Sequence, residues 1–194
     1  VAVWRETIAG LAKTNSLTGI PTDLNYEQLA IEYEVRVNPV WPMPGVESCL
    51  AELRTHQLPL GIISNAQFFT PVTLTTLLGH SLEALGFVDN LCVWSFRHAQ
   101  AKPGTFLFLG ARDCLASLGI APGEVLYIGN DMLNDMLPAS QMGFRTALFA
   151  GDARSLRLRE DDDRVGGLSP DLVITHWDQL NEAIDLPERS EDNR

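Results

Sequence analysis

Short apolar runs alternate with helical patterns along most of this chain, and this alternation constrains the fold more than any other feature. The runs are predicted strands at residues 60–64, 91–94, 124–128, 146–150 and 171–174. Helical patterns lie between and around them, at residues 46–56, 70–85, 105–118, 131–142 and 178–184. Strands that alternate with helices are typical of a parallel sheet. The sequence therefore predicts an α/β fold with helices on both faces of the sheet.

The first 43 residues have a different pattern. Amphipathic helices are predicted over residues 1–17 and from residue 22 or 23 to residue 38. The proline-rich stretch at residues 39–45 then forms a stiff linker. We expect a helical segment at residues 1–43, an α/β core at 44–186 and a polar, mobile tail at 187–194.

Composition and charge exclude several classes of partner. The 194 residues carry a formal net charge of −11 and no basic run, so we expect no nucleic-acid partner. Apolar stretches are too short for a membrane span or a signal peptide, so we expect no membrane partner either. The three cysteines form no C-x-x-C pair, which favours reduced thiols and a cytoplasmic location.

Polar side chains follow the first two strands of the predicted core. Ser64 and Asn65 end the first strand, and Lys102 lies in the stretch after the second. Ligands bind at the carboxyl ends of the strands in sheets of this kind. A serine hydroxyl can hydrogen-bond a phosphoryl oxygen, and a lysine ammonium can neutralise its charge. These residues predict a site for an anionic substrate.

The third strand is followed by a cluster of amide and carboxylate side chains, which includes Asn130, Asp131 and Asp135. Their oxygens suit a hard cation, most plausibly Mg²⁺. Asn and Asp are also the preferred N-cap residues, and a turn with a helix N-cap explains this loop alone equally well. Taken with Ser64 and Lys102, the loop favours a phosphate site with a metal.

Three segments in this order resemble the haloacid dehalogenase-like (HAD) superfamily, most of whose members are Mg²⁺-dependent phosphatases. They are PGVESCLAELRTHQLPLGIISNA, HAQAKPGTFLF and VLYIGNDMLNDMLPASQMGFRTALF, and they begin at residues 44, 98 and 125. The resemblance implies a Rossmann-like sheet and a helical cap before Pro44. It also implies that Ser64 binds phosphate, that Lys102 pairs with phosphate and nucleophile, and that the loop after Gly129 binds Mg²⁺.

The metal loop departs from the family pattern, because Gly129 is followed by Asn130 where the family usually has Asp. In one register Asn130 and Asp135 are the ligands. In the other register Asp131 and Asp135 lie one helical turn apart on the same face. An amide oxygen is also a hard ligand, so both registers remain open, although an Asn lowers the charge of the site.

A second departure concerns the nucleophile. The family's Asp-x-Asp motif ends an apolar strand, and no such strand precedes Val1. The only spacing match lies at residues 161–165, in a polar stretch that is better interpreted as an exposed acidic turn. We therefore expect a longer working protein, with the nucleophilic Asp upstream of residue 1, and we expect these 194 residues alone to be inactive. In the family this absent strand is central to the sheet.

The sequence thus predicts hydrolysis of a small phosphorylated metabolite through an aspartyl-phosphate intermediate. A metal-independent haloacid dehalogenase of the same family is one alternative. A fold that kept its phosphate pocket without catalysis is another.

Overall fold

The computed structural model describes residues 1–183, and the chain divides into two compact units, Val1–Pro42 and Met43–Arg194. The predicted tail at residues 187–194 lies outside the described residues. The first unit contains helices α1 (Ala2–Lys13) and α2 (Tyr26–Val37). The two helices pack through Trp4 and Tyr33, whose ring centroids lie 4.9 Å apart in an edge-on arrangement. Both helices are shorter than predicted.

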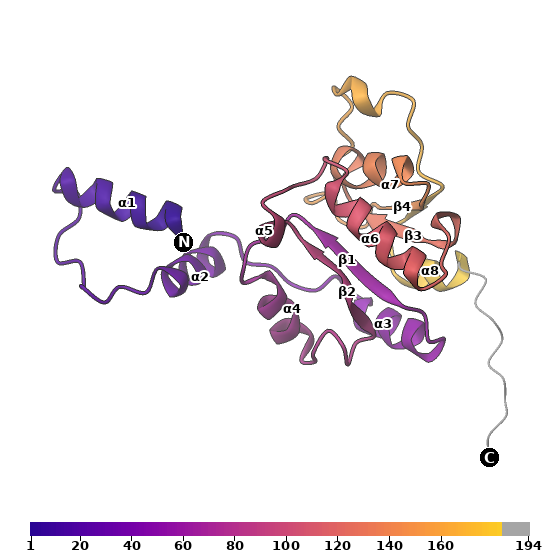
Figure 1. Cartoon of the computed structure of the whole chain (residues 1–194), viewed down its shortest axis with the longest axis horizontal. Coiled ribbons are helices and arrows are strands. Elements are labelled where there is room, and N and C mark those ends of the chain that lie inside the picture. Colours follow the sequence, from indigo (N-terminus) through magenta and orange to yellow (C-terminus); the bar gives the residue numbers. More distant parts are fainter. Residues whose placement is uncertain (184–194) are drawn as a thin grey trace, which may run out of the picture. The chain divides into compact units, whose positions relative to one another are not determined.

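Within the described residues, the second unit holds five strands in two parallel sheets (Figure 1). The strands are β1 (Leu60–Ser64), β2 (Phe87–Trp94), β3 (Leu126–Gly129), β4 (Arg145–Phe149) and β5 (Leu172–Ile174). Strand β1 pairs with β2, and the other sheet has the order β3-β4-β5. All five predicted strands are therefore present, and β2 begins earlier than predicted.

Helices surround these sheets in the second unit. The α-helices are α3 (Val46–Thr55), α4 (Thr70–Leu78), α5 (Ser95–His98), α6 (Phe106–Ser117), α7 (Leu137–Gln141) and α8 (Asp178–Ala183). The short helices are η1 (Pro122–Glu124), the π-helix η2 (Met132–Met136) and η3 (Asp163–Val165). Among the described residues, no helix has the length and apolar character needed to cross a membrane.

Alternate residues of β3 pack against helices on opposite faces of the sheet. Ile128 joins a buried cluster with Cys49 and Leu53 of α3 and with Leu180 of α8. Tyr127 faces the other way, towards a second cluster that contains Phe108 of α6. Phe108 is fully buried, and burial of such a side chain contributes about 1.5–3 kcal/mol. The period of two along the strand therefore places helices on both faces, as the sequence predicts.

Two predicted helices differ from the structure. The helix predicted over 70–85 ends at Leu78, because Gly79 takes a left-handed conformation with φ +68° and stops it. The helix predicted over 131–142 is split into η2 and α7. Pro138 has no N–H to donate to the carbonyl four residues earlier, and this missing bond favours the wider π turn at that point.

The break between the two sheets separates β1 from β3. Within the described residues no ladder joins these strands, and a side chain connects them instead. The hydroxyl of Tyr127 on β3 lies 3.2 Å from the carbonyl oxygen of Ile63 on β1. The two sheets are thus linked at this point by a side-chain contact and not by a backbone ladder.

Candidate active site

Lys102 lies in the loop between α5 and α6, and its ammonium group is held by three acceptors. The shortest hydrogen bond, 2.6 Å, goes to Asp135 Oδ1 and forms an ion pair. The other two go to the Ile63 carbonyl oxygen at 3.0 Å and to the Tyr127 hydroxyl oxygen at 3.2 Å. The Lys102 and Asp135 side chains are only 11% and 7% exposed. All three ammonium hydrogens are thus used in a largely buried network.

Asn65 fixes the backbone of Lys102. Its Oδ1 accepts a hydrogen bond of 2.7 Å from Lys102 N, and its Nδ2 donates to Lys102 O at 3.1 Å. The sequence predicts Asn65 as a substrate-binding residue, which stays a prediction, and the structure shows its amide in this contact with the Lys102 backbone. Ser64 lies beside it at the carboxyl end of β1, half-buried, and its hydroxyl makes no hydrogen bond to another described residue. That hydroxyl is available to a ligand.

Asp135 is the acceptor at the centre of the site. Its Oδ2 accepts hydrogen bonds of 3.1 Å from the backbone N–H groups of Asn130 and Asp131. The close approach depends on Gly129, because a Cβ at that position would lie 2.5 Å from the Asp135 side chain. Burial, followed by the nearby charge of Asp135 and its hydrogen bond, raises the pKa of Tyr127 well above its usual value. Tyr127 therefore remains a neutral hydroxyl donor.

Asp131 is an N-cap, as the alternative interpretation of the loop predicts. Its Oδ1 accepts from the backbone N–H groups of Leu133 at 2.9 Å and Asn134 at 3.0 Å. Arg159 adds two bonds, from Nη2 to Oδ2 at 2.6 Å and from Nε to Oδ1 at 3.2 Å. Burial by itself raises the pKa of Asp131, but the bonds from Arg159, Asn134 and Leu133 outweigh it and lower the pKa to about 2.

The three predicted metal ligands do not fit Mg²⁺ in this arrangement. Asp131 and Asp135 already accept five and four hydrogen bonds from protein donors. Their charges are balanced by the Arg159 and Lys102 cations. Asn130 turns its Nδ2 to the Ser155 carbonyl oxygen at 2.6 Å. In the part of the chain that the structure describes, no group of three or more His, Cys, Asp or Glu side chains is arranged to hold a metal ion.

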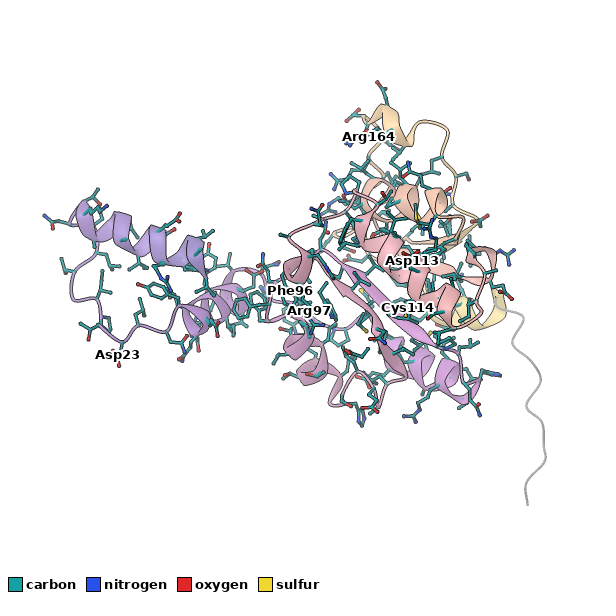
Figure 2. All side chains as sticks on the ribbon, viewed as in Figure 1. Asp23, Phe96, Arg97, Asp113, Cys114 and Arg164 are labelled. Carbon is teal, nitrogen blue, oxygen red and sulfur yellow. The ribbon has the colours of Figure 1, made fainter. Side chains whose placement is uncertain are left out.

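The acidic stretch at residues 161–165 is a turn that continues into η3 (Asp163–Val165), and its charged side chains lie at the surface, as predicted, while Val165 is buried. Asp162 pairs with Arg164 of the same turn, with an Nη2–Oδ2 distance of 2.7 Å. Figure 2 labels Arg164 on this turn. These carboxylates do not end a strand, so the turn does not supply the family's attacking carboxylate.

Two residues of the site were not predicted. Tyr127 has a signal in the sequence, since strand alternation turns it to the face opposite its two neighbours. Arg159 has none, because it lies 28 residues from the Asp131 that it contacts.

A family model described as haloacid dehalogenase-like hydrolase matches residues 5–149, which is most of the chain. The chain belongs to this family. The family resemblance seen in the sequence is therefore confirmed, and the parallel α/β architecture agrees with it. No curated protein matches the chain.

Solved structures with similar folds include phosphatases and dehalogenases. A HAD phosphatase from Thermococcus onnurineus is 20% identical with a TM-score of 0.60, over 84% of this chain and 66% of that one. A HAD-like protein of unknown function from Agrobacterium tumefaciens is 19% identical with a TM-score of 0.58, over 93% of this chain and 76% of that one.

A 2-haloacid dehalogenase from Pseudomonas syringae is 24% identical with a TM-score of 0.54, over 84% of this chain and 63% of that one. This chain thus spans just under two thirds of the phosphatase and of the dehalogenase. At these identities the likeness concerns the fold.

Proposed function

We propose that this HAD-like hydrolase cleaves a small phosphomonoester. The observation that carries the proposal is the Lys102 cation, which contacts Ile63 O and Asn65 on either side of Ser64 at the carboxyl end of β1. The Ser64 hydroxyl makes no hydrogen bond to another described residue. An ammonium group and a hydroxyl at this position suit the oxygens of a transferring phosphoryl group. Asn65 and Asp135 hold the lysine in place, so the charge is positioned before the substrate arrives.

The attacking carboxylate is proposed to come from a strand between β1 and β3, outside the described residues. Two features support this: the sheets are not joined there, and Ile63 O takes its hydrogen bonds from the side chains of Lys102 and Tyr127. A backbone N–H from an added strand would satisfy that carbonyl instead. Lys102 would then have a hydrogen free for a phosphoryl oxygen.

The reaction proceeds in two displacements at phosphorus. The aspartate oxygen forms a bond to phosphorus while the ester oxygen leaves with its electron pair and takes a proton from the second carboxyl of the family's Asp-x-Asp motif. Water then gives its proton back to that carboxylate as it attacks the aspartyl phosphate, which releases inorganic phosphate and restores the nucleophile. In both steps Lys102 balances the charge on the phosphoryl oxygens and Ser64 donates a hydrogen bond.

A haloacid dehalogenase is the second candidate, and the state of the acidic loop favours it. The carboxylates expected to hold Mg²⁺ are engaged by Lys102 and Arg159. In a dehalogenase the attacking carboxylate forms an ester to carbon as halide leaves, and this step needs no metal. The same rim would then hold the carboxylate of the haloacid.

Residues 1–43 are proposed to form the cap that the resemblance implies. Cytoplasmic location also remains a proposal, supported by the three cysteines, each of which is a free thiol.

The experiment is a release assay on the protein expressed from its complete gene. Inorganic phosphate is measured with p-nitrophenyl phosphate and a panel of phosphomonoesters, and chloride with 2-chloropropionate, each with and without EDTA. We expect phosphate release, and a loss of about 10²–10³-fold in Lys102→Ala. Lys13→Ala, which removes the chain's other lysine from the exposed side of α1, is the matched control and should keep full activity.

Two outcomes would contradict the phosphatase proposal, and a third would contradict the role of Lys102. Chloride release without phosphate release would establish the dehalogenase. Binding of vanadate without any turnover would favour a non-catalytic phosphate-binding protein. Equal phosphate release by Lys102→Ala and Lys13→Ala would remove Lys102 from the reaction.

A further inference from the structure

Residues 155–159, here called the arginine arm, lie along the loop after β3. Arg157 N donates to Asn130 O at 2.9 Å, and Met132 N donates to Arg157 O at 2.9 Å. These two bonds form a short parallel bridge, and the side chain of Asn130 adds a third bond to Ser155 O. The arm is thus attached to the loop that the family resemblance assigns to a metal.

The arm is also anchored by apolar packing. Leu156 packs on a buried cluster that contains Met132 of the loop, Leu148 of β4 and Val165 of η3. Arg159 at the end of the arm has φ +58°, a left-handed conformation that costs free energy for a residue with a Cβ. A cost of this kind persists only where the surrounding contacts favour it. The contact of Arg159 is the bidentate ion pair with Asp131.

The two arginines of the arm behave differently, which gives a matched pair. Arg157 turns its guanidinium to the backbone carbonyls of Arg154 and Leu156. Arg159 uses Nε and Nη2 on Asp131, and its Nη1 makes no hydrogen bond to another described residue. The Arg159 side chain is 39% exposed.

We propose that Arg159 is the resident cation of Asp131, and that it excludes a divalent metal from that carboxylate. The two oxygens of a carboxylate offer about four lone-pair positions, and five hydrogen bonds already use them on Asp131. Mg²⁺ needs direct oxygen contacts at about 2.0–2.1 Å, so it binds here only if Arg159 leaves. A metal would also be repelled by the positive charge of Lys102, which is paired with Asp135.

The guanidinium then supplies, at this edge of the sheet, the positive charge that the resemblance assigns to a metal. This inference deepens the proposed function by naming the cation of the same site. It does not depend on the reaction, because cation binding is measured without turnover.

The test measures Mn²⁺ binding to the protein expressed from its complete gene. Electron paramagnetic resonance reports the free and the bound Mn²⁺. We expect no saturable binding at this loop in the unmodified protein or in Arg157→Ala. Arg159→Ala should gain a saturable Mn²⁺ site, with an affinity at least about tenfold above the weak, non-saturating binding of the unmodified protein, because a buried carboxylate loses its counter-charge. Asp131→Asn added to Arg159→Ala should remove that site, which assigns it to this carboxylate. Circular dichroism checks that each variant is folded.

Two results would overturn the proposal. One is Mn²⁺ binding to the unmodified protein that Asp131→Asn abolishes and Arg159→Ala leaves unchanged. The other is a folded Arg159→Ala that gains no Mn²⁺ site, because Arg159 would then not be what excludes the metal.

Should Arg159→Ala fail to fold, the Arg159 Nε–H resonance of the unmodified protein gives the answer. Millimolar Mg²⁺ should leave its chemical shift unchanged, and a saturable shift would refute exclusion. Loss of phosphatase activity in any of these samples would affect the proposed function and leave the binding result standing.

Discussion

The ion pair between Lys102 and Asp135 gives the most demanding test of the site. Lys102→Met keeps most of the aliphatic stem and removes the ammonium group. Asp135 then stays in a position where its side chain is 7% exposed, with Tyr127 and two backbone N–H groups as remaining donors. Removing one partner of a buried ion pair costs about 3–5 kcal/mol, because the other charge is left uncompensated. We expect a loss of stability in this range.

A double-mutant cycle separates the interaction energy of the Lys102–Asp135 ion pair from the effect of each substitution on packing. Asp135→Asn keeps the shape of the side chain and removes its charge, so Lys102→Met together with Asp135→Asn leaves no buried charge unpaired. The double variant should therefore be more stable than the sum of the single changes predicts, by about 1–3 kcal/mol.

The assay is urea unfolding at neutral pH, followed by circular dichroism. Arg164→Ala is the control, because its pair with Asp162 lies on an exposed turn and its loss should leave the midpoint unchanged. The reasoning is refuted if Lys102→Met costs less than about 1 kcal/mol, or if the two single changes simply add.

Two further predictions concern the loop after β3. Gly129→Ala places a Cβ 2.5 Å from the Asp135 side chain and should lower stability by about 1–3 kcal/mol in thermal unfolding. Gly110→Ala on α6 is the control: a Cβ there has no neighbouring atom within 4 Å, so this change should be neutral or stabilising. The pKa of Asp131 is about 2 in the folded chain and about 3.9 in the unfolded chain. The ionised Asp131 therefore contributes about 2–3 kcal/mol to the free energy of unfolding above pH 4, and this contribution is lost as the pH falls through 2. Urea midpoints measured across this range should fall more steeply in the unmodified protein than in Asp131→Asn, and parallel curves would contradict the assignment.

The sequence by itself determined the strands, most of the helices and the rim on which the polar residues lie. These features follow from local periods, as the alternation of Tyr127 and Ile128 between two clusters shows. Ser64 and Lys102 were predicted as site residues because they follow strands, and parallel strands end at one edge. Pro138 also held a local signal, although the helical period on both sides of it concealed the π turn.

Only the tertiary structure decided which charges meet. Lys102 and Asp135 are 33 residues apart, and Arg159 and Asp131 are 28 apart. The sequence placed Asp131 and Asp135 as metal ligands because carboxylates near one another favour a cation, but it carried no sign that two protein cations already contact them. That outcome depends on how the sheet and the arginine arm bring distant segments together, and a charge is neutralised by whichever partner the folded chain places beside it.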